Sequence, residues 1–155
     1  MAMMRKILTG IVLLLPLPAT GQQMRLSNLV PEGWVETCAD IGTKTRRFVS
    51  PDGQSIMTSS ESVAHRGSLQ RDMDGIAYHS GERLTYQRRS DSWIAVSGYK
   101  DRHIFYRKSN LACGGSRWHN IELEYPIEEK RRMDNPVTQI AHDMALYSED
   151  CGQTN

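Results

Sequence analysis

The sequence has few features that would tie the protein to nucleic acid, to a metal ion or to an anionic surface. Its 155 residues carry 19 lysines and arginines against 18 aspartates and glutamates, so no excess of positive charge is available for a phosphate backbone. Neither a C-x2-C nor an H-x3-H spacing occurs and the five histidines are scattered, which argues against structural zinc. We therefore expect no nucleic-acid partner, no bound metal and no other cofactor.

Signals of a modular protein and of a common hydrolase are also missing. The chain has no internal repeat, low-complexity run or linker, which indicates a single domain. The glycine-flanked serine typical of the α/β-hydrolases is absent. Beyond the N-terminal region no second long apolar run occurs, so we do not expect the protein to be embedded in a membrane.

The first 21 residues have the pattern of a secretory signal peptide. Arg5 and Lys6 form a charged start, Ile7–Leu17 is mostly apolar but too short to span a bilayer, and Ala19-Thr20-Gly21 offers small residues for cleavage. Cleavage near Gly21 would place the mature chain in the periplasm or outside the cell, with 17 basic against 18 acidic residues. An uncleaved membrane anchor is the alternative. We expect one domain over residues 22–151 and a short tail over residues 152–155.

Short runs of β-branched and aromatic residues predict up to seven strands. They cover residues 34–39, 45–49, 54–63, 83–89, 93–99, 103–111 and 116–125. Helices are predicted over residues 68–80, with Ser68 as N-terminal cap and Gly81 at the C-terminal end, and over residues 127–147, which Asn135-Pro136 divides in one interpretation. This order predicts an α+β domain, an antiparallel sheet of about six to seven strands with two helices packed on one or both faces.

Several motifs resemble a known fold. The Val30-Pro-Glu-Gly-Trp34 segment, the turn at Phe48–Gly53 and the element order are similar to the PsbP/Mog1-like fold. The motifs Ser97-Gly-Tyr-Lys100 and Leu123-Glu-Tyr-Pro126, among others, also resemble a domain of exported alphaproteobacterial proteins and domains appended to bacterial caspase-like proteins. The resemblance covers residues 30–147 in outline. It implies a fold more than a function, because its motifs are structural.

Gly114-Gly115 between two strand-like runs predicts a two-residue hairpin turn. This register sets Arg107 opposite Glu122, a favourable cross-strand pair, on one face of the sheet. The opposite face, which we assign to the core, then carries five apolar side chains: Ile104, Tyr106, Ile121, Leu123 and Tyr125. A slip of one residue would bury glutamates instead.

The same register predicts how the three cysteines pair. The last strand runs roughly 33 Å away from the hairpin tip, and a returning helix of similar length would bring Cys151 back to Cys113. In an oxidising compartment we therefore expect a Cys113–Cys151 disulfide with Cys38 free, stabilising the fold by about 4 kcal/mol on the chain-entropy model. A Cys38–Cys113 pair is the alternative.

Residues of catalytic type occur, but their spacing supports catalysis weakly, and we predict no catalytic residue. Cys113 and His119 would be roughly 10 Å apart along the strand, too far for a nucleophile and its base. The residue types of a catalytic triad occur, but no motif supports one. The candidates are Ser59 or Ser60, His65 or His79, and Asp72 or Asp74. The paired carboxylates Glu122 and Glu124 share one face, where basic neighbours such as Arg107 would neutralise them.

Trp118 and Phe105 share the outer face of the hairpin with Arg107 and Glu122. An aromatic side chain among charged neighbours is typical of a protein contact, so these four residues are the predicted partner surface. The alternative is that a helix covers this face and that Trp118 belongs to a second core.

Three functional hypotheses follow. The leading one is an exported, non-enzymatic domain that binds an unidentified protein or cell-envelope component. The second is an immunity protein or a periplasmic enzyme inhibitor, and the third is a small serine hydrolase. The sequence names neither the partner nor the oligomeric state.

Peptide mapping of the unreduced protein tests the predicted cysteine pairing. We expect one crosslinked pair that contains Cys113 and Cys151, together with a Cys38 peptide that reacts with an alkylating reagent before reduction. A crosslink that contains Cys38 would contradict the predicted register of the terminal helix.

Overall fold

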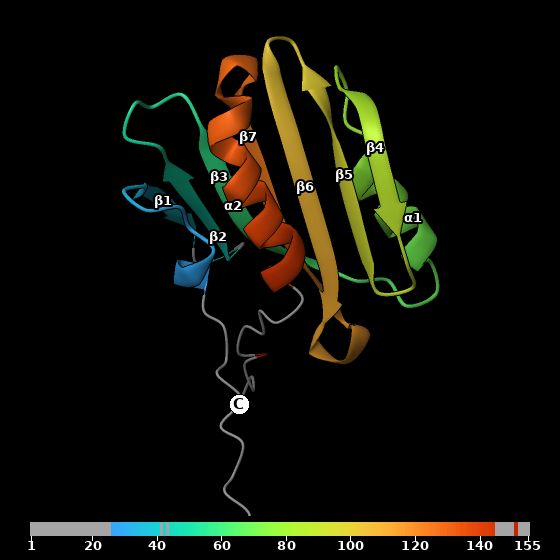
Figure 1. The fold of residues 1–155 in the computed structure, drawn as a ribbon. Coiled ribbons are helices and arrows are strands. Elements are labelled where there is room, and N and C mark those ends of the chain that lie inside the picture. The colour runs from blue at the N-terminus through green and yellow to red at the C-terminus, as the bar shows by residue number, and fades with distance from the viewer. Residues whose placement is uncertain (1–25, 41, 43, 145–150, 152–155) are drawn as a thin grey trace, which may run out of the picture.

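One antiparallel sheet of seven strands with a helix on each face makes up the described part of the chain (Figure 1). The structure is a computed structural model that describes residues 26–40, 42, 44–144 and 151. The predicted signal peptide, residues 1–21, and the predicted tail, residues 152–155, lie outside the described residues. The α+β class, with an antiparallel sheet and two helices, is confirmed.

The strands are arranged as two meanders that meet in the middle of the sheet. Their bounds are Val35–Asp40 (β1), Thr45–Val49 (β2), Ile56–Val63 (β3), Arg83–Arg89 (β4), Trp93–Lys100 (β5), His103–Ala112 (β6) and Arg117–Pro126 (β7). The strand order is β1-β2-β3-β7-β6-β5-β4, and all neighbours are antiparallel. The chain therefore crosses from β3 to the far edge through the first helix and returns strand by strand to pair β7 with β3.

The two helices lie on opposite faces of the sheet (Figure 1). Helix α1, Leu69–Ala77, packs on β5, and helix α2, Lys130–Asp143, packs on β6 and β7. Single 3-10 turns form at Leu26–Asn28, Cys113–Gly115 and Ile127–Glu129. Neither helix in the described part of the chain is both long and apolar enough to cross a membrane.

Side-chain alternation along the strands produces a separate core under each helix. The larger core lies under α2 and contains Phe48, Met57, Ile121, Leu123, Tyr125, Met133 and Ile140, among others. The smaller core lies under α1 and contains Ala64, Met73, Ala77, Ile94, Val96, Phe105 and Trp118. Because both faces of the sheet are buried, the side chains on both faces of β6 are either apolar or bonded to other groups of the protein.

The predicted register of the β6–β7 hairpin is confirmed from His103–Pro126 to Ala112–Arg117, and Arg107 lies opposite Glu122. The predicted two-residue turn is wrong, because the loop has four residues, Cys113–Ser116. The Ser116 amide donates to the Ala112 carbonyl at 3.2 Å, and its hydroxyl donates to the Cys113 carbonyl at 2.8 Å. These two bonds satisfy backbone groups that a two-residue turn would have paired directly.

Two details of the predicted helices are wrong. Pro136 does not divide the terminal helix, since α2 runs through it from Lys130 to Asp143. The residues that follow it, Val137 and Ile140, pack on the larger core, and this burial outweighs the hydrogen bond that proline removes. The first helix also ends early, at Ala77, because Tyr78 has an extended backbone. Residues 145–147 of the predicted second helix lie outside the described residues.

Two contacts join β6 and the hairpin loop to the C-terminal part of the chain. The structure joins Cys113 to Cys151 by a disulfide, with 5.4 Å between the Cα atoms, and leaves Cys38 free and exposed on the edge strand β1. This is the pairing that the hairpin register predicts. The ammonium of Lys108 on β6 donates to the Ala141 carbonyl in the last turn of α2, where the helix dipole favours a cation. Burial lowers the pKa of Lys108.

Two glycines should respond in opposite ways to alanine. A Cβ on Gly98 would lie 2.1 Å from the backbone oxygen of Arg83 on β4, whereas a Cβ on Gly75 in α1 would meet nothing within 4 Å. We expect Gly98→Ala to lower the free energy of unfolding by about 2 kcal/mol or more, because one backbone must move. Gly75→Ala should raise it by up to about 1 kcal/mol, because alanine favours a helix.

Urea unfolding of both variants beside the natural protein measures these changes. A Gly98→Ala protein as stable as the natural one would contradict the close approach of β4 to β5.

Candidate functional site

A pocket of about 430 Å³ lies between α1 and the strands β3 and β7. It forms because α1 packs on β5 and the smaller core but leaves the neighbouring half of the same sheet face open. Gly75 faces it from the helix without a side chain. The site therefore has one helical wall, one strand wall and a floor made by β6 and β7.

The strand wall is a row of hydroxyl groups. Thr58, Ser60 and Ser62 alternate along β3 and line the pocket, while Met57 and Ser59, which belong to the opposite row of the strand, point to the other face and are buried. The row follows directly from the period of two in a strand. Of the two serines considered as nucleophiles, the structure thus leaves Ser60 in the pocket and removes Ser59 from it.

The floor presents an amide whose orientation is fixed by its neighbours. Asn120 on β7 lies beside Ser60 on β3, and its side-chain oxygen accepts a hydrogen bond of 2.7 Å from the Ser109 hydroxyl. Its side-chain nitrogen donates to the Ser62 hydroxyl at 3.2 Å. Because both ends of the amide are held, a ligand would meet it in a defined orientation.

A buried arginine closes one end of the floor. The Arg107 guanidinium lies between Glu122, with nitrogen–oxygen distances of 3.0 and 3.1 Å, and Glu82, with a shortest distance of 2.9 Å. It also donates to the Ile76 carbonyl in α1 at 2.9 Å. Burial opposes its charge, but the bonds to Glu122 and Glu82 outweigh that effect and raise the pKa of Arg107. The cluster ties α1, the turn before β4 and the hairpin together.

The helical wall carries a second fixed carboxylate. Asp72 accepts the Trp118 indole N–H at 3.1 Å, the His65 backbone N–H at 2.8 Å and a contact from the His65 ring at 2.8 Å. Its partial burial favours the neutral acid, but these bonds prevail and lower the pKa of Asp72. Asp72 therefore ties the first turn of α1 to the segment before the helix and to β7, whereas the predicted Ser68 cap makes no side-chain hydrogen bond.

The predicted partner surface on the hairpin is wrong in its central residues. Trp118 and Phe105 are each only 1% exposed, because α1 packs over them, and Arg107 is 3% exposed. The Arg107 guanidinium stacks over the Phe105 ring at 5.1 Å. Trp118 is thus part of a second core, and of the four residues only Glu122, with a third of its side chain exposed, can meet a ligand freely.

The hollow continues beyond Glu122 along the open sheet face. A smaller depression of about 260 Å³ shares Thr58 and Glu122 with the pocket and extends to Arg47 and Glu124. The two glutamates share a face, as predicted, and Arg107 neutralises the first of them. Together the two hollows form a continuous polar surface over β2, β3 and β7.

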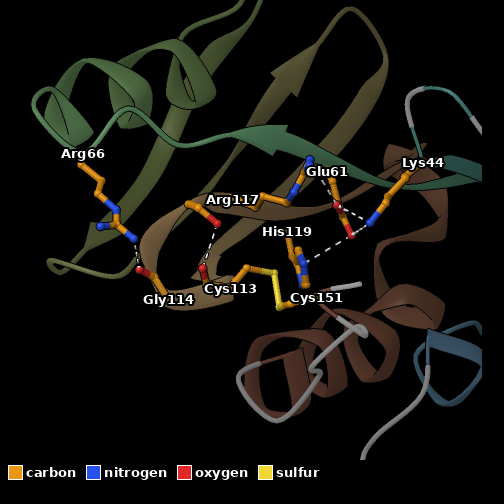
Figure 2. Close-up of a disulfide and its surroundings, with 9 residues drawn as sticks. Lys44, Glu61, Arg66, Cys113, Gly114, Arg117, His119 and Cys151 are labelled. Atoms are coloured by element: carbon orange, nitrogen blue, oxygen red, sulfur yellow. Dashed lines mark hydrogen bonds and ion pairs between the residues drawn. A yellow bond between two sulfur atoms is a disulfide. The ribbon is translucent and has the colours of Figure 1, made fainter. Parts of the chain in front are cut away.

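The structure keeps apart most of the nucleophile and base residues that the sequence offers for a catalytic site. Cys113 is held in the disulfide, and the buried His119 lies 3.5 Å from a Glu61 oxygen that also pairs with Lys44 (Figure 2). Burial lowers the pKa of His119, which Glu61 opposes. His65 faces solvent beside Asp72.

Ser60 and His79 are the exception, because both line the pocket, and His79 Nδ1 lies 3.7 Å from Glu82. Among the described residues no serine hydroxyl is hydrogen-bonded to a histidine ring. The described residues also contain no group of three or more acidic, histidine or cysteine side chains that could hold a metal ion.

Comparison with known proteins gives a structural neighbour. No family model matches the chain, and no curated protein matches it. Among solved structures, the chain is similar to the solution structure of cyanobacterial PsbP (CyanoP) from Synechocystis sp. PCC 6803, with 12% sequence identity and a TM-score of 0.47. The similarity covers 72% of this chain and 81% of that chain. The neighbour is of the kind that the sequence resemblance named, and no function follows from it.

Replacing Arg107 by methionine should strongly destabilise the protein. The variant leaves the buried Glu82 carboxylate and the Ile76 carbonyl without their donor, which costs about 3–5 kcal/mol of unfolding free energy for an ion pair of this kind. Urea unfolding measures the loss. Adding Glu82→Gln should restore part of the stability, because it removes the uncompensated charge.

Arg102→Met is the matched control, since its pair with Glu128 is exposed and should contribute at most about 1 kcal/mol. Equal urea midpoints for the two methionine variants would contradict the structural role of the Arg107 cluster.

Proposed function

We propose that this protein is an exported, non-catalytic binding domain that takes a small polar ligand, or a polar group of a cell-envelope partner, in the pocket between α1 and β3. One observation carries the proposal: the polar floor of the pocket is held in place before any ligand arrives. Asn120 is fixed at both ends of its amide, and Glu122 is held by Arg107. Preorganised groups of this kind lose little entropy on binding.

The charge pattern of the pocket favours a neutral polar ligand over an ion. Arg107 is compensated by two carboxylates, and Asp72 by His65 and the Trp118 indole. A charged ligand would have to compete with these contacts, whereas hydroxyl and amide groups can use the Thr58–Ser60–Ser62 row as it stands. The volume lies within the range of small-molecule sites in proteins.

Export is the second element of the proposal. It is supported by the charged and apolar N-terminal pattern and by the Cys113–Cys151 disulfide, which suits an oxidising compartment.

Blocking the pocket tests the binding function. Gly75→Leu introduces a side chain into the open space of the pocket, and Gln70→Leu places the same side chain on the exposed outside of α1. Both tagged variants and the natural protein are expressed with their own N-terminus in a bacterial host and captured from the periplasm. Native mass spectrometry then identifies the bound molecules.

We expect the captured protein to lack about 21 N-terminal residues and to carry a ligand that Gly75→Leu loses and Gln70→Leu retains. Equal retention by both variants would contradict the site, and full-length protein in the cytoplasm would contradict export. A toxin or hydrolase that Gly75→Leu fails to retain would assign the neutralising function among the hypotheses.

A second function, serine hydrolase, is favoured by the presence of Ser60 and His79 in one pocket with Glu82 beside the histidine. The same preparations distinguish it. Hydrolysis of p-nitrophenyl acetate that Ser60→Ala abolishes and Ser62→Ala preserves would replace the binding proposal with this one. Absence of turnover in the natural protein would leave the binding function in place.

A further inference from the structure

A second cleft lies on the opposite face of the sheet, between α2 and the strands β4, β5 and β6. It has a volume of about 370 Å³, and tyrosines from four different strands line it. They are Tyr86 on β4, Tyr99 on β5, Tyr106 on β6 and Tyr125 on β7. The chain has only six tyrosines, so most of them gather at this one place.

The strand register arranges these rings in two facing pairs. Tyr86 pairs with Ser97, and Ser97 pairs with Tyr106 on the next strand. In the neighbouring row, Tyr99 pairs with Ile104, and Ile104 pairs with Tyr125. Each pair of rings is therefore separated by one intervening strand, a distance of roughly 10 Å. Ser97 is a small side chain and leaves a slot between Tyr86 and Tyr106. Ile104, Tyr106 and Tyr125 are buried at the floor, so Tyr86 and Tyr99 present the more exposed rings.

Helix α2 forms the long wall of the slot. The stripe that faces the tyrosines consists of Lys130, Asp134, Val137 and Ala141. These positions span roughly 16 Å along the helix axis. The cleft is thus an elongated groove beside α2, apolar at one end and charged at the other.

The groove is close to neutral although charged residues lie at its rim. Lys130 pairs with Asp134 at 3.6 Å, and the Arg83 guanidinium already stacks on the Tyr99 ring at 5.3 Å. Burial raises the pKa values of Tyr106 and Tyr125 to about 12, so both phenols keep their protons at any physiological pH. The groove therefore offers phenol hydroxyls, which donate and accept hydrogen bonds, beside a carboxylate that accepts them.

We propose that this tyrosine groove binds a short neutral saccharide. Pyranose rings present a C–H face that packs on an aromatic ring and a rim of hydroxyls that both donate and accept, which matches phenols beside Asp134. A cationic ligand would meet Lys130 and Arg83. A proline-rich peptide could use the phenol donors, but its proline carbonyls only accept and would leave the Asp134 carboxylate without a hydrogen-bond donor.

NMR titration of the oxidised protein with cellobiose and with N,N′-diacetylchitobiose tests the proposal. We expect saturable amide shifts at millimolar sugar, confined to α2 and to the strands that carry the four tyrosines, β4, β5, β6 and β7. Tyr86→Ala removes a half-exposed ring of the groove and should weaken binding about tenfold. Asp134→Asn removes an exposed acceptor charge with little effect on folding and should weaken binding as well.

Tyr78→Ala is the matched control, because Tyr78 is an exposed tyrosine at the end of α1 and does not line the groove. It should bind both sugars as the natural protein does. No shift with either sugar at tens of millimolar, or shifts produced by octaproline alone, would overturn the proposal. Gly75→Leu separates the two sites: it should abolish binding in the α1–β3 pocket and leave the sugar titration unchanged.

Discussion

The pairing of β3 with β7 is the constraint on which the rest of this structure depends. It joins the first three strands to the last four, in register from Ile56–Glu124 to Val63–Arg117. Because the two strands come from different meanders, their shared register decides which side chains from each half face the same helix. The β3 hydroxyl row and the β7 amide and carboxylate meet in one pocket for this reason alone. A shift of β3 by one residue against β7 would turn the β3 hydroxyl row toward the α2 core and leave the β7 amide and carboxylate on the pocket side.

The Arg107 cluster converts that register into a defined site. A buried guanidinium between two carboxylates stabilises a fold only modestly compared with an apolar alternative, because all three groups lose water. Its value here is positional. It connects the hairpin to the end of α1 and to the turn before β4, so the wall and floor of the pocket cannot move independently. Such a cluster contributes less to the free energy of unfolding than to holding the wall and the floor of the pocket in one arrangement.

The sequence predicted the strands and the hairpin register because both rest on local pattern, and the cysteine pairing followed from that register and from the length of the returning helix. Ile121, Leu123 and Tyr125 alternate with glutamates, and a glycine pair lies between two strand-like runs, so few registers were possible. The sequence left open whether a helix covers Trp118, since this depends on where α1 crosses the sheet between β3 and β4. Glu82 was missed for a similar reason. It lies in a turn with no motif, and only the folded chain brings it to Arg107.

The disulfide turns β7 and α2 into a closed ring, since it links positions 38 residues apart at the hairpin tip and beyond the terminal helix. A chain that already carries this bond starts folding with one of its non-local contacts made. The entropy of bringing the end of α2 back to the hairpin has then been removed from the search, which shortens the effective contact order of the central strand. The oxidised chain should accordingly reach the native sheet faster than the reduced one, with β7 assembling early as the strand onto which β3 later docks.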